Sequence, residues 1–356
     1  MTPQATSDAT PTLLREPLKY SGALDQFRSF DYAPAIGTEY PDLQLTDILD
    51  DDAKLRDLAI TVSRRGVVFL RKQQISTDQM KIVASKLGEL TGKPSTSKLH
   101  RHAIAESQRE LSVEMNGKFD DEVWLVASRI RRSHYAKKFQ VLRDLASDEW
   151  HTDLAYENVP ADYGLLQIIT NPQEQAGGDT LFASGYEAYE RLSPTFRQML
   201  EGMEVVKIQA RMARVVDDHK INLIRENRGS PENSGSEFQS THPHCSTSPV
   251  IRTNPVTGWK TLAATGIAAR EGHFKDVTHY ESEVLKKYLH TLVVHNHDLQ
   301  IRFKWGEGDI AIWDNDFDGK RQGFRVLSVG ERPYLDPASK SRREGLLNEL
   351  QGPASS

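Results

Sequence analysis

The chain contains one cysteine, Cys245, among its 356 residues. A single thiol can form neither an intramolecular disulfide nor a thiolate-rich metal cluster. The composition therefore excludes a disulfide-stabilised scaffold and is typical of a protein kept in a reducing compartment. We expect a cytoplasmic location.

Charge of one sign and long apolar runs are also missing. Lys and Arg total 45 and Asp and Glu total 50, which gives a net charge of -5 with the two signs interspersed. Such a surface does not favour nucleic acid or an anionic membrane. No stretch is long enough to span a bilayer, and the first residues carry no apolar run typical of a secretory signal. We expect a small-molecule substrate, no nucleic-acid partner and no membrane partner, and we leave homo-oligomerisation open.

The length bounds the domain organisation. A chain of this size can bury a large core, and β-barrels with helical additions often form one domain at this length. Residues 1–15 are rich in Thr, Pro, Ala and Ser and are predicted to be a mobile N-terminal segment. We expect residues 16–347 to form a single domain and residues 348–356 to form a polar tail.

Hydrophobic periodicity predicts both helices and strands. Helices are expected over residues 45–60, after Ser76, from Pro194 to Met203, and from about 280 to 294. Strands are expected over residues 67–70, 163–170, 299–303 and 309–313. Ser76 and Gln79 stand at capping-box spacing, and Ser193 precedes a proline suited to the first helical position. Residues 226–240 are rich in Asn, Ser, Gly and Glu and are predicted to form a surface loop.

One short motif carries metal-binding chemistry. His151 and Asp153 are two residues apart, so on a strand they would present an imidazole nitrogen and a carboxylate oxygen to one cation. Taken alone, such a tripeptide arises freely by chance and is far more often an ordinary pair. A two-histidine, one-carboxylate iron centre also needs a second imidazole from further downstream. No histidine follows His297.

Nine motifs stand in a fixed order around this pair, at residues 150–153, 159–163, 177–182, 184–186, 241–243, 250–255, 296–300, 311–315 and 340–344. Together they resemble the taurine dioxygenase family of iron(II)- and 2-oxoglutarate-dependent oxygenases, especially its fungal members. The likeness runs from about residue 40 to residue 347. Several separate motifs in the right order make this a specific resemblance.

The resemblance implies a fold and a site. The fold would be mainly β with flanking helices, a double-stranded β-helix or jelly-roll barrel whose mouth holds iron. By position, His151 and Asp153 match the first two metal ligands. Thr180 matches a hydroxyl that hydrogen-bonds 2-oxoglutarate, and Arg321 matches the arginine that pairs with its distal carboxylate. Arg325 matches a second arginine, which faces the substrate anion in sulfonate-using members.

The spacing of the two arginines also favours a role in binding a carboxylate. Arg321 and Arg325 are four residues apart and would share one face of a strand. A guanidinium is suited to bidentate capture of a carboxylate. Without the resemblance, solvated surface charges would be the better interpretation, because that is the default for arginine.

The resemblance also implies an activity. The cofactors would be Fe(2+), 2-oxoglutarate as cosubstrate and O2, and the enzyme would oxidise a C–H bond of a small organic substrate with release of succinate and CO2. Hydroxylation is the leading expectation, with desaturation and ring formation left open. Many fungal relatives act on natural-product intermediates, which indicates secondary metabolism. The alternative is a catalytically impaired or non-catalytic binding protein built on the same barrel.

The sequence departs from the family after Asn315. Family members continue there through a strand that carries the second ligand histidine, whereas here residues 316–319 follow at once. Four explanations stay open. A gene-model or splicing error removed a segment, or the protein is a true pseudoenzyme. Alternatively, His244 supplies the missing metal ligand, or Asp316 or Asp318 takes that position.

Two further histidines, His100 and His102, lie where the chain resembles the family's substrate-side loop. A role in shaping the pocket is one interpretation. A neutral structural histidine, hydrogen-bonded or exposed, is the more frequent outcome for such residues.

Overall fold

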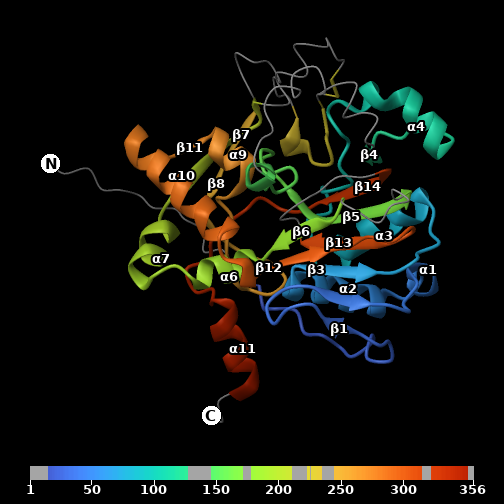
Figure 1. Ribbon diagram of the computed structural model, residues 1–356, viewed down its shortest axis with the longest axis horizontal. Coiled ribbons are helices and arrows are strands. Elements are labelled where there is room, and N and C mark those ends of the chain that lie inside the picture. The colour runs from blue at the N-terminus through green and yellow to red at the C-terminus, as the bar shows by residue number, and fades with distance from the viewer. Residues whose placement is uncertain are drawn as a thin grey trace.

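A seven-stranded sheet forms the centre of the molecule, with the strand order β1-β2-β3-β13-β5-β14-β4 (Figure 1). The structure is a computed structural model that describes residues 15–126, 146–170, 178–210, 223–224, 226–234, 244–314 and 322–351. The strands of this sheet are β1 (Phe30–Asp31), β2 (Thr38–Tyr40), β3 (Val67–Leu70), β13 (Ile310–Asp314), β5 (Ala161–Thr170), β14 (Gln322–Val329) and β4 (Trp124–Val126). Strands β2 and β3 are parallel, and the other pairs are antiparallel. The predicted strands over 67–70, 163–170 and 309–313 are confirmed.

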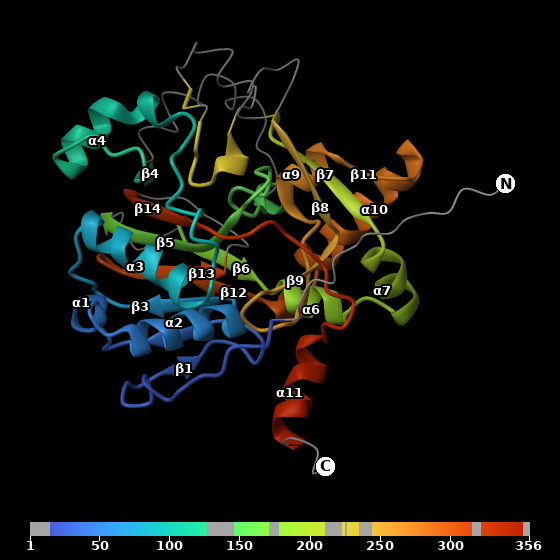
Figure 2. The same cartoon turned by 180° about the vertical axis from the view of Figure 1, so that it is seen from behind.

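Two helices cover one face of this sheet, α2 (Asp52–Arg65) and α3 (Thr77–Leu90), as Figure 2 shows from behind. Helix α3 begins with the predicted capping box, in which Ser76 and Gln79 bond each other's backbone N–H groups. The prediction of one helix over 45–60 was wrong. Asp51 has non-helical backbone angles and its side chain accepts from the N–H of Lys54, which starts α2 afresh after the short helix α1 (Leu45–Ile48).

The other face of the sheet packs against the antiparallel pair of β6 (Thr180–Ala183) and β12 (Gln300–Phe303). Phe303 stacks on Phe69 of β3 with ring centroids 3.8 Å apart, and Phe182 meets the same ring edge-on. These aromatic contacts hold the strand that begins with Thr180 close to the central sheet. Phe182 and Trp313 are buried, as expected for core residues.

A second apolar core lies beside the sheet and is built from short strands and helices. Its strands are β7 (Glu204–Ile208), β8 (Cys245–Pro249), β9 (Ile251–Thr253), β10 (Lys260–Leu262) and β11 (His273–Phe274). Its helices are α6 (Gly185–Glu190), α7 (Pro194–Glu201), α9 (Gly266–Glu271) and α10 (His279–Val294). The predicted helices after Ser193 and up to residue 294 are confirmed, and Thr278 and Glu281 add a second capping box.

Three smaller features complete the described fold. Helix α4 (Arg109–Asn116) precedes β4, and short 3-10 helices cover Ala105–Gln108, Ala146–Glu149, Pro231–Asn233 and His297–Leu299. Helix α11 (Arg342–Gln351) projects from the body in Figures 1 and 2 and runs into the segment expected to be a polar tail. Arg64 of α2 binds Glu349 of α11 through two hydrogen bonds of 2.8 and 2.7 Å.

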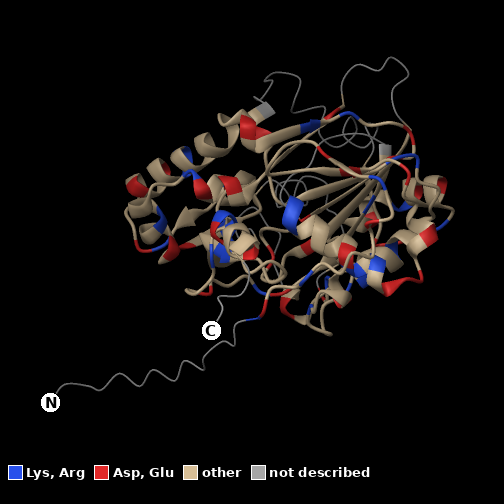
Figure 3. Ribbon diagram, turned by 90° about the horizontal axis from the view of Figure 1, so that it is seen from below, with Lys and Arg blue, Asp and Glu red and all other residues tan. Residues whose placement is uncertain are grey.

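Acidic and basic residues are interspersed along the ribbon in Figure 3. Among the described residues, no helix combines the length and the apolar character needed to cross a membrane.

Close packing at Gly164 yields a stability prediction. Gly164 lies opposite Trp313 across the β5–β13 pair, and a Cβ atom at residue 164 would lie 2.5 Å from two atoms of the indole ring. The backbone of Gly164 is in a central strand, so neither partner can retreat easily. We expect Gly164→Ala to lower the free energy of unfolding by about 1–3 kcal/mol. Chemical denaturation measures this, with Gly202→Ala as a control because a Cβ there meets no atom closer than 3.7 Å.

Candidate metal and cosubstrate site

His151 and Asp153 face one another just before the central strand β5. The distance between His151 Nε2 and Asp153 Oδ1 is 3.6 Å. The expectation that they sit on a strand was wrong, because residues 151–160 form loop and turn, and β5 begins only at Ala161. The loop nevertheless brings the two side chains together, with Asp153 buried and His151 partly exposed.

A backbone carbonyl orients the imidazole ring of His151. Nδ1 of His151 lies 2.7 Å from the carbonyl oxygen of Glu149. A carbonyl oxygen can only accept, so Nδ1 carries a proton, and Nε2 is the ring nitrogen that faces Asp153. Metal-binding histidines have this arrangement, with one ring nitrogen donating to a carbonyl and the other facing the ion. An imidazole nitrogen and a carboxylate oxygen are donor types of an iron site, so this pair fits two of its positions.

Arg325 supplies a positive charge to the same carboxylate. Its Nη1 donates to both oxygens of Asp153, at 2.9 and 3.0 Å, from β14. Burial acts to raise the pKa of Asp153, but the charge of Arg325 and the contact with His151 outweigh it, and the pKa lies below its ordinary value. Asp153 is therefore held as a carboxylate, the form that binds metal. Arg325, predicted to face a substrate anion, contacts the metal-ligand candidate in this structure.

Thr180 opens strand β6 and is buried. Its Oγ1 accepts a hydrogen bond of 2.9 Å from the indole Nε1 of Trp305. A threonine hydroxyl also has one proton to donate. The bond from Trp305 therefore fixes the oxygen while leaving the O–H proton for a carboxylate oxygen of a bound ligand.

The remaining predicted site residues either lie outside the described part of the chain or have another partner. Arg321, Asp316 and Asp318 lie outside the described residues. Nε2 of His244 lies 2.9 Å from Oε2 of Glu157, so that imidazole is committed to a carboxylate instead of a vacant metal position. In the part of the chain that the structure describes, no three His, Cys, Asp or Glu side chains gather closely enough to hold a metal ion.

The strand register gives the distance that the chain must span between β13 and β14, after Asn315. Strands β13 and β14 both run antiparallel to β5, so they are parallel to one another. Asp314 lies opposite Tyr163 near one end of β5, and Gln322 lies opposite Thr170 at the other. At ~3.3 Å per residue and two strand spacings, these ends are roughly 25 Å apart. Residues 315–321 give eight Cα steps, which reach at most about 28 Å.

A connection between parallel strands usually takes roughly a dozen residues or more, because the chain must first return along the sheet. Residues 315–321 lie outside the described part of the chain, so the departure after Asn315 stays a prediction from the sequence.

A buried ion triad beside the site escaped the sequence analysis. Arg228 donates to both oxygens of Glu157 at 2.9 Å from Nε and from Nη2, and both side chains are fully buried. Burial acts to raise the pKa of Glu157, but hydrogen bonds from His244 and Arg228 lower it to about 2. The prediction of a surface loop over 226–240 was therefore only partly right where the structure describes it: Asn227 and Glu232 are exposed, but Arg228, Ser230 and Asn233 are buried.

His100 and His102 are both buried, and burial lowers the pKa of each, for His100 to about 4. They are neutral at pH 7, as expected for structural histidines. The exposed alternative does not apply.

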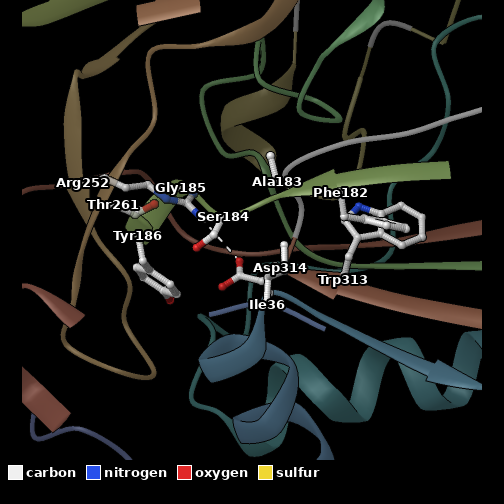
Figure 4. A pocket seen from close by; sticks show the side chains of 11 residues that line it. Ile36, Phe182, Ala183, Ser184, Gly185, Tyr186, Arg252, Thr261, Trp313 and Asp314 are labelled. Atoms are coloured by element: carbon white, nitrogen blue, oxygen red, sulfur yellow. Dashed lines mark ion pairs between the residues drawn. The ribbon is translucent and has the colours of Figure 1, made fainter. Parts of the chain in front are cut away.

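A small cavity lies at the end of β13 (Figure 4). Its volume is about 20 Å3, and Figure 4 shows Arg252 beside Asp314, whose carboxylate is 3.6 Å from Nη2 of the arginine. Such a volume holds about one water molecule. The contact between Arg252 and Asp314 stabilises the end of β13. The cavity is too small for an organic substrate.

Known proteins share this sequence and this fold. The family described as "Taurine catabolism dioxygenase TauD, TfdA family" matches residues 28–316. The chain is 42% identical to alpha-ketoglutarate-dependent dioxygenase btcD of Neocamarosporium betae, over 93% of this chain and 99% of that protein. It is 38% identical to alpha-ketoglutarate-dependent dioxygenase esdpJ of Penicillium shearii, over 93% of this chain and 96% of that protein.

Among solved structures, a taurine dioxygenase from Burkholderia xenovorans has a similar fold, with a TM-score of 0.61 and 22% identity. The match covers 88% of this chain and 92% of that one. The fold, a sheet framework with flanking helices, is therefore the one found in taurine dioxygenases. The extent of the family match and the identity to the fungal relatives lead to one conclusion: this chain belongs to the TauD/TfdA family of dioxygenases.

Proposed function

We propose that this chain is an iron(II)- and 2-oxoglutarate-dependent dioxygenase in which His151 and Asp153 hold the metal. The observation that carries the proposal is the 3.6 Å distance between His151 Nε2 and the Asp153 carboxylate, with Nδ1 of the same ring bonded to the Glu149 carbonyl. Relatives at 38–42% identity are named alpha-ketoglutarate-dependent dioxygenases, alpha-ketoglutarate being another name for 2-oxoglutarate. These relatives favour an enzyme over a non-catalytic binding protein.

The reaction we propose is oxidation of a C–H bond, with hydroxylation as the outcome, and release of succinate and CO2. When bound, iron and 2-oxoglutarate supply the oxidising chemistry with O2, and the protein supplies binding and orientation. Asp153 is held ionised by Arg325, and His151 is held in the metal-binding tautomer by the Glu149 carbonyl. Thr180 would donate a hydrogen bond from its hydroxyl to a carboxylate oxygen of bound 2-oxoglutarate, and Arg321, by its position in the family, would pair with the distal carboxylate.

We assign the sheets to a double-stranded β-helix, the jelly roll implied by the family. The antiparallel pair β6–β12 facing the β3–β13–β5–β14 region supports this assignment. We place the catalytic unit in one domain over 16–347, in the cytoplasm, acting on a small organic substrate of secondary metabolism. The single cysteine supports the location.

Succinate release tests the function. Purified protein with ferrous iron, ascorbate and 2-oxoglutarate should release succinate in air and none under argon. The same protein supplied with zinc in place of iron is the control. Oxygen-independent succinate, or none with iron in air, would favour the non-catalytic alternative.

The hydroxyl of Thr180 yields a binding prediction. Thr180→Val keeps the side-chain shape but removes the proton donor and the acceptor for Trp305. Loss of a hydrogen bond to a charged group costs about 1.5–3 kcal/mol, so we expect 2-oxoglutarate to bind roughly 10- to 100-fold more weakly. Calorimetric titration measures this, and Thr180→Ser, which retains the hydroxyl, is the matched control. Equal affinity in the valine variant would remove Thr180 from the cosubstrate site.

A further inference from the structure

His100 borders the Asp153–Arg325 pair. Its backbone N–H donates to the carbonyl of Leu327 at 2.8 Å, so His100 runs beside β14, the strand that also carries Arg325. The charge of Arg325 acts on the pKa of His100, and His100 in turn acts on that of Asp153. The imidazole therefore lies within electrostatic reach of the proposed metal ligand.

Two more rings, those of His102 and Trp124, lie beside His100 and Arg325. The ring of His102 stacks on Trp124 at 3.7 Å, and Trp124 is the cross-strand partner of Arg325. The rings of His100 and His102 meet edge to face at 5.6 Å. Because both imidazoles are neutral, they add no charge beside Arg325.

The tautomer of His100 follows from its one hydrogen bond. Nδ1 lies 3.1 Å from the carbonyl oxygen of Arg228, which can only accept, so Nδ1 carries the proton. The ring is neutral because burial lowers its pKa to about 4. Nε2 is thus left with a lone pair, and within the described residues no donor reaches this buried atom.

The ion triad fixes this arrangement. Arg228, whose carbonyl sets the tautomer, is held by two bonds to Glu157, and His244 contacts the same carboxylate. Breaking a fully buried pair is strongly unfavourable, so the Arg228 backbone has little freedom to move. Glu157 is therefore a positioning residue that acts on His100 through Arg228.

A buried acceptor without a donor is energetically unfavourable. A bound molecule that brings an O–H or N–H group to Nε2 removes this cost, whereas a sulfonate or carboxylate would place its own lone pairs against it. Arg325, the cation expected to meet an anion, is already bonded to Asp153. The local chemistry therefore favours a donor over an anion.

We infer that His100 Nε2, locked as a hydrogen-bond acceptor by the Glu157–Arg228 pair, selects a neutral substrate that carries a hydroxyl or N–H group. This inference rests on the proposed function, because it assigns the substrate side of the same site. It differs from the expectation of an anionic substrate raised by Arg325.

The tautomer is tested first, in the metal-free full-length protein. Long-range 1H–15N correlation spectra of 15N-histidine-labelled protein should show His100 protonated on Nδ1 and bare on Nε2 at pH 7. The His100→Gln variant assigns the signal by its loss. A proton on Nε2, or a charged ring, overturns the inference.

Selectivity is tested with three probes that share one ring, namely phenol, anisole and benzenesulfonate. Phenol should shift the His100 Nε2 signal and bind at least about tenfold more tightly than anisole, which has no donor. In His100→Leu this preference should disappear while anisole binding changes little. Preferential binding of benzenesulfonate, or equal binding of phenol and anisole to the unsubstituted protein, contradicts the inference.

These measurements need neither iron nor turnover. Failure of the succinate assay would leave the tautomer and the phenol preference unaffected, whereas failure of the probe tests would leave succinate release unaffected. The two proposals can therefore fail separately.

Discussion

Substitution of His151 by alanine is expected to abolish iron(II) uptake and succinate release. His151 supplies one of the two described metal donors, and its Nε2 is oriented toward Asp153 by the Glu149 carbonyl. Loss of an orienting contact around a metal typically costs 10- to 100-fold in affinity, so loss of the ligand itself should weaken iron binding by more than about 100-fold. Equilibrium dialysis with ferrous iron under argon measures the affinity directly.

A matched control is His273→Ala. His273 is an exposed histidine of β11, and its removal takes away an imidazole without touching the loop of residues 149–153. Its iron affinity should equal that of the unsubstituted protein. Iron uptake by His151→Ala at the control level would remove this residue from the ligand set.

Substitution of Glu157 by glutamine is expected to destabilise the fold by about 3–5 kcal/mol, the cost of breaking a buried ion pair by removing one charge. Arg228 would keep its charge with no exposure to water. Urea denaturation at pH 7 measures the loss. The double variant Glu157→Leu with Arg228→Met should lose less than Glu157→Gln, because no charge is left buried. If the single variant were the more stable of the two, the pair would not hold this region together.

The same pair predicts a pH dependence. The pKa of Glu157 is about 2 in the folded chain and 4.5 in its ordinary state, so the unfolded chain binds this proton first as pH falls. The stability from ionised Glu157 is therefore complete above about pH 4.5 and is lost as pH falls toward 2. The difference in unfolding free energy between the unsubstituted protein and Glu157→Gln should shrink over that interval.

Local sequence signals predicted the elements whose cause is local. The Ser76–Gln79 capping box, the apolar strand after Gly66 and the helix after Ser193 depend on residues within four positions of one another. The break between α1 and α2 was missed because hydrophobic spacing continues across Asp51, although an aspartate there is a capping signal.

Within the site, too, local pairs could be predicted from the sequence and distant pairs could not. His151 and Asp153 could be paired from sequence because they are two residues apart, but the loop that presents them was mistaken for a strand. Arg228 could not be found, because its partner Glu157 is 71 positions away and its neighbours are polar residues typical of a surface loop. The bond between Arg325 and Asp153 spans 172 positions and likewise has no local signature.

The contact between Thr180 and Trp305 could be predicted once the register of β6 and β12 is known. Thr180 lies opposite Phe303 in the β6–β12 pair, and Trp305 follows two residues later. Once these two strands are paired, the indole is placed near the hydroxyl. The strand pairing itself is the step that sequence does not supply.

The most direct test of the account is spectroscopic. Anaerobic addition of ferrous iron and 2-oxoglutarate should produce the visible metal-to-ligand charge-transfer band of a chelated iron(II) complex, and His151→Ala should produce none. An equal band in His151→Ala, or no band in the unsubstituted protein at saturating iron and 2-oxoglutarate, would contradict the claim that His151 and Asp153 together bind the metal.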